Sequence, residues 1–282
     1  MDSSTSKLER KVLDHGLVRL VDCMPAADSS GCAFESAIVQ MARVSYGSGT
    51  KSFREDMGLV NYLLENDHTS PFEGVTIKFH IKMPIFVARQ WVRHRTASIN
   101  EYSARYSVLE DQFYVPEPSR LTGQSATNKQ GSSSEQIPEA DLVSSIISEH
   151  SKVSYDLYEK LLEKGLSREL ARMVIPVNVY TEMYWVMNLH NLLKFLRLRM
   201  DDHAQYEIRV FADAIYEIMH EIAPNIMETW KSSQMEAVKL TAEEIKIMSN
   251  HISVDDRIDK PEGWSARRFD TFMSKLKALI SK

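Results

Sequence analysis

The chain has 282 residues, a net charge of −5 and an ordinary globular composition, with 43% hydrophobic and 26% charged residues. This length can bury a full core, and the acidic balance argues against a general nucleic-acid binder. No apolar run approaches the roughly 18 residues of a membrane span, and the N-terminus has no apolar stretch typical of a secretory signal. The two cysteines suggest no disulfide framework. We therefore expect a cytoplasmic protein without membrane contact.

The N-terminal half predicts two strands and three helices. Residues 16–24 alternate as a strand, and residues 34–46 and 53–66 carry apolar side chains at helical spacing. Residues 75–82 form the clearest predicted strand, and a helix is expected from Pro84 to about Arg95. The alternation of that strand places four apolar residues on one face: Val75, Ile77, Phe79 and Ile81.

The middle of the chain predicts a surface segment followed by helices. Residues 119–140 are polar and should form a mobile surface insertion. A long amphipathic helix is expected over 139–164, and a shorter segment with a Ser cap over 167–176. The apolar face of the long helix is marked by Leu142, Ile146, Val153, Leu157 and Leu161.

The rest predicts a strand or buried crossing at 177–188 and a helix at 191–199. A further helix should start at a capping box of Asp202 and Gln205 and stop before Pro224. Helices and strands mix without regular βαβ alternation, which favours an α+β fold with a mixed or antiparallel sheet and flanking helices. We expect one domain over 1–240 and a C-terminal extension over 241–282, whose two amphipathic pieces could pack on an assembly or contact a partner.

A cationic cluster in this acidic chain needs an explanation. On a regular helix Arg89, Gln90 and Arg93 share one side, whereas Arg95 points about 200° away from Arg93. Either the helix ends there or the two arginines serve different anionic groups, because the planar guanidinium favours phosphate and carboxylate. The alternative is a solvated basic face with ion pairs to carboxylates.

The residues after this cluster favour a ligand site. The nine residues 98–106 supply a dense set of polar groups, among them Ser98, Asn100, Glu101, Ser103, Arg105 and Tyr106. Such density is typical of a loop that cradles a ligand. The sequence RQWVRHRTASINEYSARYS, with seven residues between Arg93-His94-Arg95 and Ser103, closely resembles the signature of the flavin-dependent thymidylate synthases. The segments HTSPFEGVTIKFHIKMPIFVARQW, ELARMVIPVNVYT and NLHNLLKFLRLRMDDHAQYE also resemble that family, in its order.

The resemblance implies an activity and an assembly. The family makes dTMP from dUMP, with 5,10-methylenetetrahydrofolate as carbon donor, FAD as hydride source and NADPH as the reductant of the flavin. Its members are homotetramers whose active sites are built from several subunits. The anions implied for the arginine cluster are the phosphate of dUMP and the diphosphate of FAD.

The resemblance also implies site residues. FAD contacts fall on Ser70, Arg93, His94, Arg95, Glu101, Asn188, His190 and Lys194, the last three from another subunit, with His68 close by. Nucleotide contacts fall on Gln90, Arg93, Glu101, Tyr102, Ser103, Ala104, Arg105, Arg172 and Arg199. Arg199 is the implied catalytic residue, its guanidinium beside N3 and O2 stabilising the ionised uracil ring. No metal is expected.

Other interpretations remain at this point. Without the resemblance, Arg199 would be a cation interacting with a helix dipole. The segments 65–68 and 217–220 are both Glu-x-x-His, the spacing of di-iron bundles. An Arg-rich helix could also serve a nucleic-acid-binding module, which the net charge disfavours. A hydride route needs no protein nucleophile, so Cys23 and Cys32 are expected to be structural.

Overall fold

A computed structural model describes residues 8–27, 32–44, 53–126, 131–249, 258–262, 264 and 266–280. The chain divides into two compact units, Met1–Met235 and Glu236–Lys282. The prediction of a domain over 1–240 and an extension over 241–282 stays a prediction.

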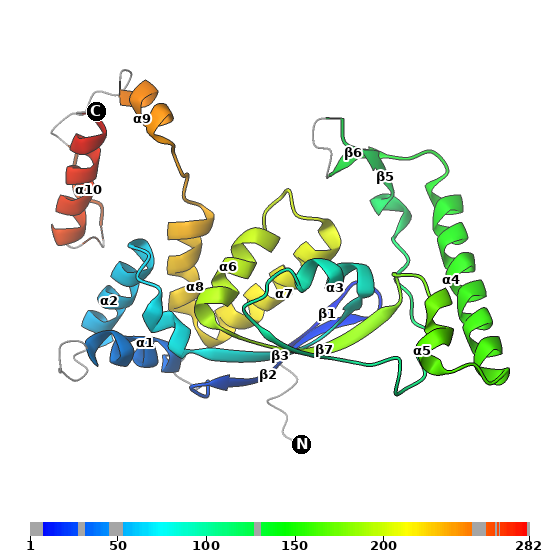
Figure 1. The fold of residues 1–282 in the computed structure, drawn as a ribbon. Helices are drawn as coiled ribbons and strands as arrows, with labels where there is room; N and C mark the ends of the chain where they lie inside the picture. The colour runs from blue at the N-terminus through cyan, green and yellow to red at the C-terminus, as the bar shows by residue number, and fades with distance from the viewer. Residues whose placement is uncertain are drawn as a thin grey trace. The chain divides into compact units, whose positions relative to one another are not determined.

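A five-stranded sheet forms the centre of the first unit (Figure 1). Its order is β1-β2-β3-β7-β4, and every neighbouring pair is antiparallel. The strands are β1 (Glu9–Val12), β2 (Gly16–Met24), β3 (Thr76–Pro84), β4 (Ser98–Glu101) and β7 (Tyr180–Asn188). The predicted α+β class with an antiparallel sheet and flanking helices is confirmed.

Alternation on β3 explains which face of the sheet is covered. Ile77, Phe79 and Ile81 are completely buried in the main core, as the sequence pattern predicted. Next to them on the sheet, Trp185 of β7 packs against Trp91 and Phe195, which come from two of the covering helices. The core therefore lies between the sheet and its helical layer.

The helices of this layer follow or surround the strands. They are α3 (Ile85–Trp91), α6 (Leu189–Arg199), α7 (Tyr206–Ile222) and α8 (Pro224–Trp230), with α1 (Ala33–Arg43), α2 (Phe53–Glu65) and the 3-10 turn η2 (Ser70–Gly74) beside them. A π-helical turn, η5 (Lys231–Met235), follows α8. Each predicted helix in this set is present, although several boundaries differ.

The predicted helix over 84–95 is wrong at its C-terminal end. It stops at Trp91, where the last turn closes through the backbone N–H of Val92 on Ala88 and of His94 on Trp91. Trp91 is completely buried, and β4 must begin at Ser98 to pair with β7. The chain therefore turns between these two fixed points, which places Arg93 and Arg95 outside any helix.

Two other predicted boundaries are also wrong. The helix α7 begins at Tyr206, because the side chain of Asp201 accepts from the backbone N–H of His203 and holds a separate turn before it. The 167–176 segment contains only a short helix, α5 (Arg168–Ala171), and a 3-10 turn, η4 (Arg172–Val174). Ser167 occupies the cap position of α5, but its side chain makes no capping hydrogen bond.

An arm built around α4 (Ala140–Glu163) lies apart from α6 and α8 (Figure 1). It is preceded by the 3-10 turn η3 (Pro118–Arg120) and a two-stranded sheet of β5 (Thr122–Gln124) and β6 (Ser132–Gln136). The sequence predicted a surface segment here but not its strands. A second small core joins α4 to α5 through Leu109, Tyr158 and Ala171.

The second unit contains α9 (Ala242–Ser249) and α10 (Ala266–Ile280). Trp264 meets the ring of Phe272 edge-on, and Arg268 lies over the Trp264 ring. Among the described residues of the whole chain, no helix is long and apolar enough to cross a membrane.

Candidate functional site

Arg199, at the C-terminal end of α6, is held by the side chain of His94 and the backbone of Gln90. Its Nε donates to Nε2 of His94 at 3.0 Å, and one terminal nitrogen donates to the backbone carbonyl of Gln90 at 3.3 Å. Burial lowers the pKa of Arg199, yet a guanidinium stays protonated in proteins. The guanidinium therefore keeps its charge in a partly dry setting, with its remaining N–H groups available to a ligand.

His94 is neutral in this arrangement. Burial, followed by the positive charges of Arg199 and Lys194, lowers the pKa of His94 to about 4. The ring also meets Phe195 edge-on, with 4.8 Å between centroids. Because Nε2 accepts the hydrogen bond from Arg199, the single ring proton resides on Nδ1.

Gln90 is fixed by a relay that starts in the interior. The buried carboxylate of Glu207 accepts from the Tyr114 hydroxyl at 3.2 Å and from Nε2 of Gln205 at 2.7 Å. Gln205 therefore turns its oxygen towards Gln90, whose Nε2 donates to it. Because a carboxylate can only accept hydrogen bonds, Glu207 fixes the orientation of the Gln205 amide, and Gln205 in turn fixes that of Gln90. The side-chain oxygen of Gln90 is left to accept from a ligand.

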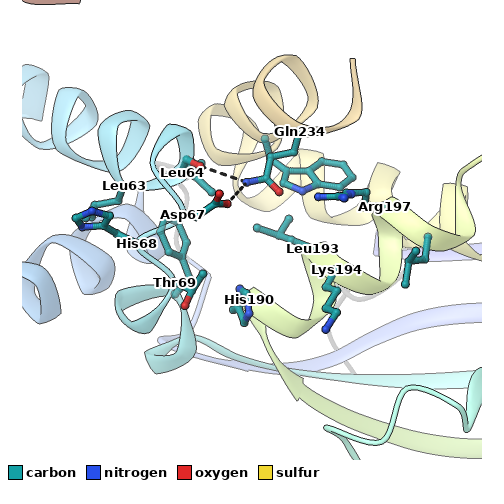
Figure 2. Close-up of a pocket in the computed structure, with 13 residues that line it drawn as sticks. Leu63, Leu64, Asp67, His68, Thr69, His190, Leu193, Lys194, Arg197 and Gln234 are labelled. Atoms are coloured by element: carbon teal, nitrogen blue, oxygen red, sulfur yellow. Dashed lines mark hydrogen bonds between the residues drawn. The ribbon is translucent and has the colours of Figure 1, made fainter. Parts of the chain in front are cut away.

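A cavity of about 300 Å³ lies on the opposite side of α6 from the sheet (Figure 2). The helix contributes His190, Lys194 and Arg197 to its wall. Leu193, Phe72 and Trp230 supply an apolar surface, and His68 and Thr69 come from the segment before η2. Gln234 donates to the carbonyl of Leu64 at 3.2 Å and so ties α2 to η5 at the rim.

Two further predicted flavin residues lie at the starts of helical turns near this cavity. The side-chain oxygen of Asn188 accepts from the backbone N–H of Asn191 and caps α6. Ser70 opens η2, next to Thr69. Asn188 thus caps α6, and the flavin contact that the resemblance implies for it stays a prediction.

The remaining predicted residues fall on the arm or on the strand beside it. Arg105 pairs with Glu169 at 3.3 Å, and Nε of Arg172 donates to the Glu169 carbonyl at 3.3 Å. The Ser103 hydroxyl accepts from the backbone N–H of Arg105. In this turn, Ala104 packs against the small core of the arm.

Tyr102 and Glu101 are held separately from that turn. The Tyr102 hydroxyl donates to the Val108 carbonyl at 2.7 Å. A carboxylate oxygen of Glu101, at the end of β4, accepts from the Thr181 hydroxyl at 2.8 Å. These contacts fix the strand end on which the predicted nucleotide-binding turn begins.

Apart from the residues at the cavity on α6, the structure brings the predicted residues together in two groups. Gln90, His94 and Arg199 form one, and Arg105 and Arg172, which both contact Glu169 of α5, form the other. Arg93 and Arg95 are exposed in the turn after α3, and within the described part of the chain their side chains pair with no carboxylate. This disfavours the alternative of a basic face saturated by ion pairs.

Sequence reasoning missed Gln205, Glu207 and Tyr114. Gln205 lies in a segment that carries the family resemblance, but Gln90 precedes it by 115 residues. No local periodicity links positions so far apart. Only the packing of α7 against α3 brings the two amides together.

The residues that the alternative interpretations singled out, in the Glu-x-x-His segment 217–220 and at the two cysteines, have structural surroundings of their own. Glu217 pairs with Arg10 at 3.0 Å, and His220 lies 3.6 Å from Glu228. No group of three or more potential metal ligands occurs among the described residues. Cys23 lies in β2, where burial raises the pKa of its thiol, and Cys32 precedes α1.

Comparison with known proteins identifies the family. The sequence model of the family described as thymidylate synthase complementing protein matches residues 28–225, more than half of the chain. The chain belongs to the flavin-dependent thymidylate synthase family. The resemblance first noted at Arg93-His94-Arg95 is thereby confirmed.

Similar proteins carry that family name over most of their length. A flavin-dependent thymidylate synthase of Dictyostelium discoideum is 51% identical over 240 residues, covering 84% of this chain and 78% of that protein. One from Rickettsia bellii (strain RML369-C) is 46% identical over 281 residues, covering 95% and 93%. A solved structure of the UMP/dUMP methylase PolB from Streptomyces cacaoi, bound with 5-Br dUMP, has a TM-score of 0.68 and 30% identity, covering 79% of this chain and 97% of that one.

Proposed function

We propose that this protein makes dTMP by reductive methylation of dUMP. The carbon comes from 5,10-methylenetetrahydrofolate, FAD is the resident cofactor and NADPH supplies the electrons. The observation that carries the proposal is the Arg199 guanidinium, partly desolvated and held by neutral His94 beside Gln90, in a chain of this family. We place the protein in the cytoplasm and assign the catalytic domain to residues 1–240, with residues 241–282 as a C-terminal extension.

The cavity on α6 fits part of a flavin dinucleotide. Its wall combines cationic groups suited to a diphosphate, His190, Lys194 and Arg197, with an apolar surface suited to an aromatic ring. When bound, FAD supplies the hydride. The volume of the cavity, about 300 Å³, is smaller than a whole dinucleotide requires, which supports a site completed by another subunit.

Arg199 and Gln90 have complementary tasks towards the pyrimidine. The guanidinium faces the edge at N3 and O2, where negative charge develops when the ring becomes electron-rich. Partial desolvation strengthens this attraction. The Gln90 oxygen, directed by Gln205, accepts from a donor on the ligand. Arg93 and Arg95, with no described carboxylate partner, bind the phosphate of dUMP and the diphosphate of FAD.

A homotetramer with shared active sites accounts for the two groups of site residues. Within one protomer α5, which immediately precedes Arg172, lies apart from α6, which ends at Arg199 (Figure 1). Met173 and Val177 are exposed on either side of the turn that follows Arg172. Exposed apolar side chains around a ligand-binding cation suit an interface between subunits. Arg172 of one protomer then binds the nucleotide beside Arg199 of another.

The test begins with the purified protein. Its absorption spectrum should show bound flavin, and NADPH oxidation should depend on dUMP and methylenetetrahydrofolate, with dTMP identified by chromatography. UMP is the matched comparison substrate, because the solved neighbour is titled a UMP/dUMP methylase. A colourless protein that forms no dTMP after FAD is supplied would contradict the proposal.

A further inference from the structure

Asn178 connects the arm to the interior of the first unit. Its Nδ2 donates to the Ser151 hydroxyl of α4 and to the backbone carbonyl of Tyr114, both at 2.9 Å. The backbone N–H of Tyr114 donates in turn to the carbonyl of Asn178 at 2.9 Å. An isolated bridge between Phe113 and Val179 continues this pairing. The place of Tyr114 is therefore fixed by a residue that also holds the arm.

The side of α4 that packs on its own protomer is the side that reaches Asn178. Ser151 and Ser154 are both buried on it, and each hydroxyl donates to the carbonyl four residues earlier at 2.9 Å. In the described part of the chain Asn178 hydrogen-bonds to Ser151 and not to Ser154. The aliphatic side chains on the opposite side of the helix are exposed: Leu142, Ile146, Val153 and Leu157.

The side chain of Tyr114 leads from Asn178 to the relay that fixes Gln90. It is buried, and its hydroxyl donates to the Glu207 carboxylate at 3.2 Å. Burial, and then the charge of Glu207, raises the pKa of Tyr114, so the hydroxyl keeps its proton. The other oxygen of Glu207 accepts from Gln205 at 2.7 Å, and Gln205 accepts from Gln90. Hydrogen bonds therefore run without a gap from α4 to Gln90, apart from the backbone step at Tyr114.

A second contact ties the same relay to the base of the arm. The guanidinium of Arg120, in η3, lies over the Tyr206 ring at 3.8 Å from its centroid. Tyr206 is the first residue of α7 and separates Gln205 from Glu207 in the sequence. Because a cation over an aromatic face attracts the ring, η3 helps to hold the turn from which both relay side chains project.

We propose that Tyr114 and Asn178 are positioning residues for the nucleotide, acting on Gln90 through Glu207 and Gln205. The inference rests on the proposed function, because it takes dUMP as the ligand of Gln90. Without the Tyr114 hydroxyl, the Glu207 carboxylate can turn away from Gln205, and the Gln90 amide loses its fixed orientation. Binding then weakens because the ligand must order that amide first. The position of the arm thereby influences how tightly dUMP is held at residues that the arm does not contact.

Direct binding of dUMP to the FAD-loaded protein tests this arrangement. Equilibrium dialysis gives the Kd without turnover, so a protein that binds dUMP but forms no dTMP would contradict the proposed function and not this inference. Tyr114→Phe should raise the Kd about five-fold, the effect of one hydrogen bond. Tyr155→Phe is the matched control, because its hydroxyl donates to the Leu109 carbonyl at 2.9 Å, within the arm. Both variants should unfold at lower urea concentrations, but only Tyr114→Phe should change the Kd.

A double-mutant cycle decides whether Tyr114 acts through Gln205. In a Gln205→Met background the relay is already broken, so adding Tyr114→Phe should raise the Kd by less than about two-fold. A further five-fold rise would show that the two residues act independently and would overturn the proposal. An unchanged Kd in Tyr114→Phe alone would overturn it as well.

The serines of α4 test the arm end of the path and do not depend on the folding of Tyr114→Phe. Ser151→Ala removes the acceptor of Asn178 and should raise the Kd for dUMP about two-fold. Ser154→Ala loses an equivalent hydrogen bond within α4 but none to Asn178, so its Kd should equal that of the parent. Equal Kd values in the two serine variants would contradict the role of Asn178.

Discussion

At the scale of single residues, the site depends on how Arg199 is oriented. A planar guanidinium bound through Nε and one terminal nitrogen leaves a fixed edge for the ligand. Lysine would keep the charge but not the fork. We expect Arg199→Lys to retain FAD and to lower dTMP formation by about two orders of magnitude.

This expectation is measured by flavin absorbance and dTMP chromatography on the same preparation. Arg209→Lys serves as the control, because Arg209 pairs with Asp202 on the surface of α7. Near-normal turnover by Arg199→Lys would remove Arg199 from the catalytic role.

The relay to Gln90 makes a different residue-scale prediction. Gln205→Met removes the acceptor that fixes the Gln90 amide, so the KM for dUMP should rise about ten-fold, the worth of one hydrogen bond, with little change in kcat. Steady-state kinetics measure both constants, and Gln136→Met, an exposed amide in β6, is the control. A fall in kcat at constant KM would show that Gln205 acts otherwise.

His94 predicts a pH dependence of stability. Its pKa of about 4 in the folded protein lies below the value of about 6.5 expected in the unfolded chain. The unfolded state therefore binds more protons between these values, and the stabilising contribution is complete above about pH 6.5 and is lost as the pH falls towards 4.

We expect His94→Gln, which offers Arg199 an acceptor that does not titrate, to lose less stability between neutral pH and pH 5 than the parent protein. Urea unfolding at the two pH values measures the difference. An identical loss in both proteins would mean that His94 is not the group responsible.

At the scale of elements, the segment before α4 is closed at its base. The backbone N–H of Ile137 donates to the carbonyl of Leu121 at 2.9 Å, so the chain returns to its starting point around residues 122–136. Replacing these residues with two glycines should leave assembly and dTMP synthesis within about two-fold of the parent. Sedimentation and turnover are the measurements, and loss of flavin would show that the segment belongs to the site.

Elements with a strong internal pattern could be predicted, and others could not. The alternation along β3 was sufficient because one face is wholly buried. All four side chains of β4 are exposed, so the strand has no alternation and exists because β7 offers it hydrogen bonds. The end of α3 escaped prediction for a similar reason, since the tertiary positions of Trp91 and Ser98 decide it.

The candidate site was predictable only in part. The RHR motif indicated His94 and the family resemblance indicated Arg199, but nothing local indicated that His94 accepts a hydrogen bond from Arg199 across 105 residues. The buried Glu207 likewise acts on Gln90 through an intermediate that the sequence does not mark. Identity of residues follows from a motif, whereas their mutual orientation follows from packing.

At the scale of the whole molecule, the separation of Arg172 from Arg199 predicts complementation between subunits. Arg172→Lys and Arg199→Lys should each be nearly inactive alone. Mixed oligomers formed by co-expression should regain about a quarter of the parent activity, because a shared site then receives both intact residues by chance. The two chains carry different affinity tags so that mixed oligomers can be isolated. No recovery in verified mixed oligomers would mean that each protomer builds its site alone.

The exposed aliphatic side chains of α4 also affect how newly made chains fold. Until they are covered, Leu142, Ile146, Val153 and Leu157 present to the cell the kind of aliphatic surface that holdase chaperones bind and that promotes aggregation. Meanwhile the inner face keeps the helix in place, because Tyr155, Tyr158, Leu161 and Leu162 pack in the small core of the arm. Newly made subunits at low concentration would then depend on protein quality control longer than subunits at high concentration, which makes expression level itself a determinant of yield.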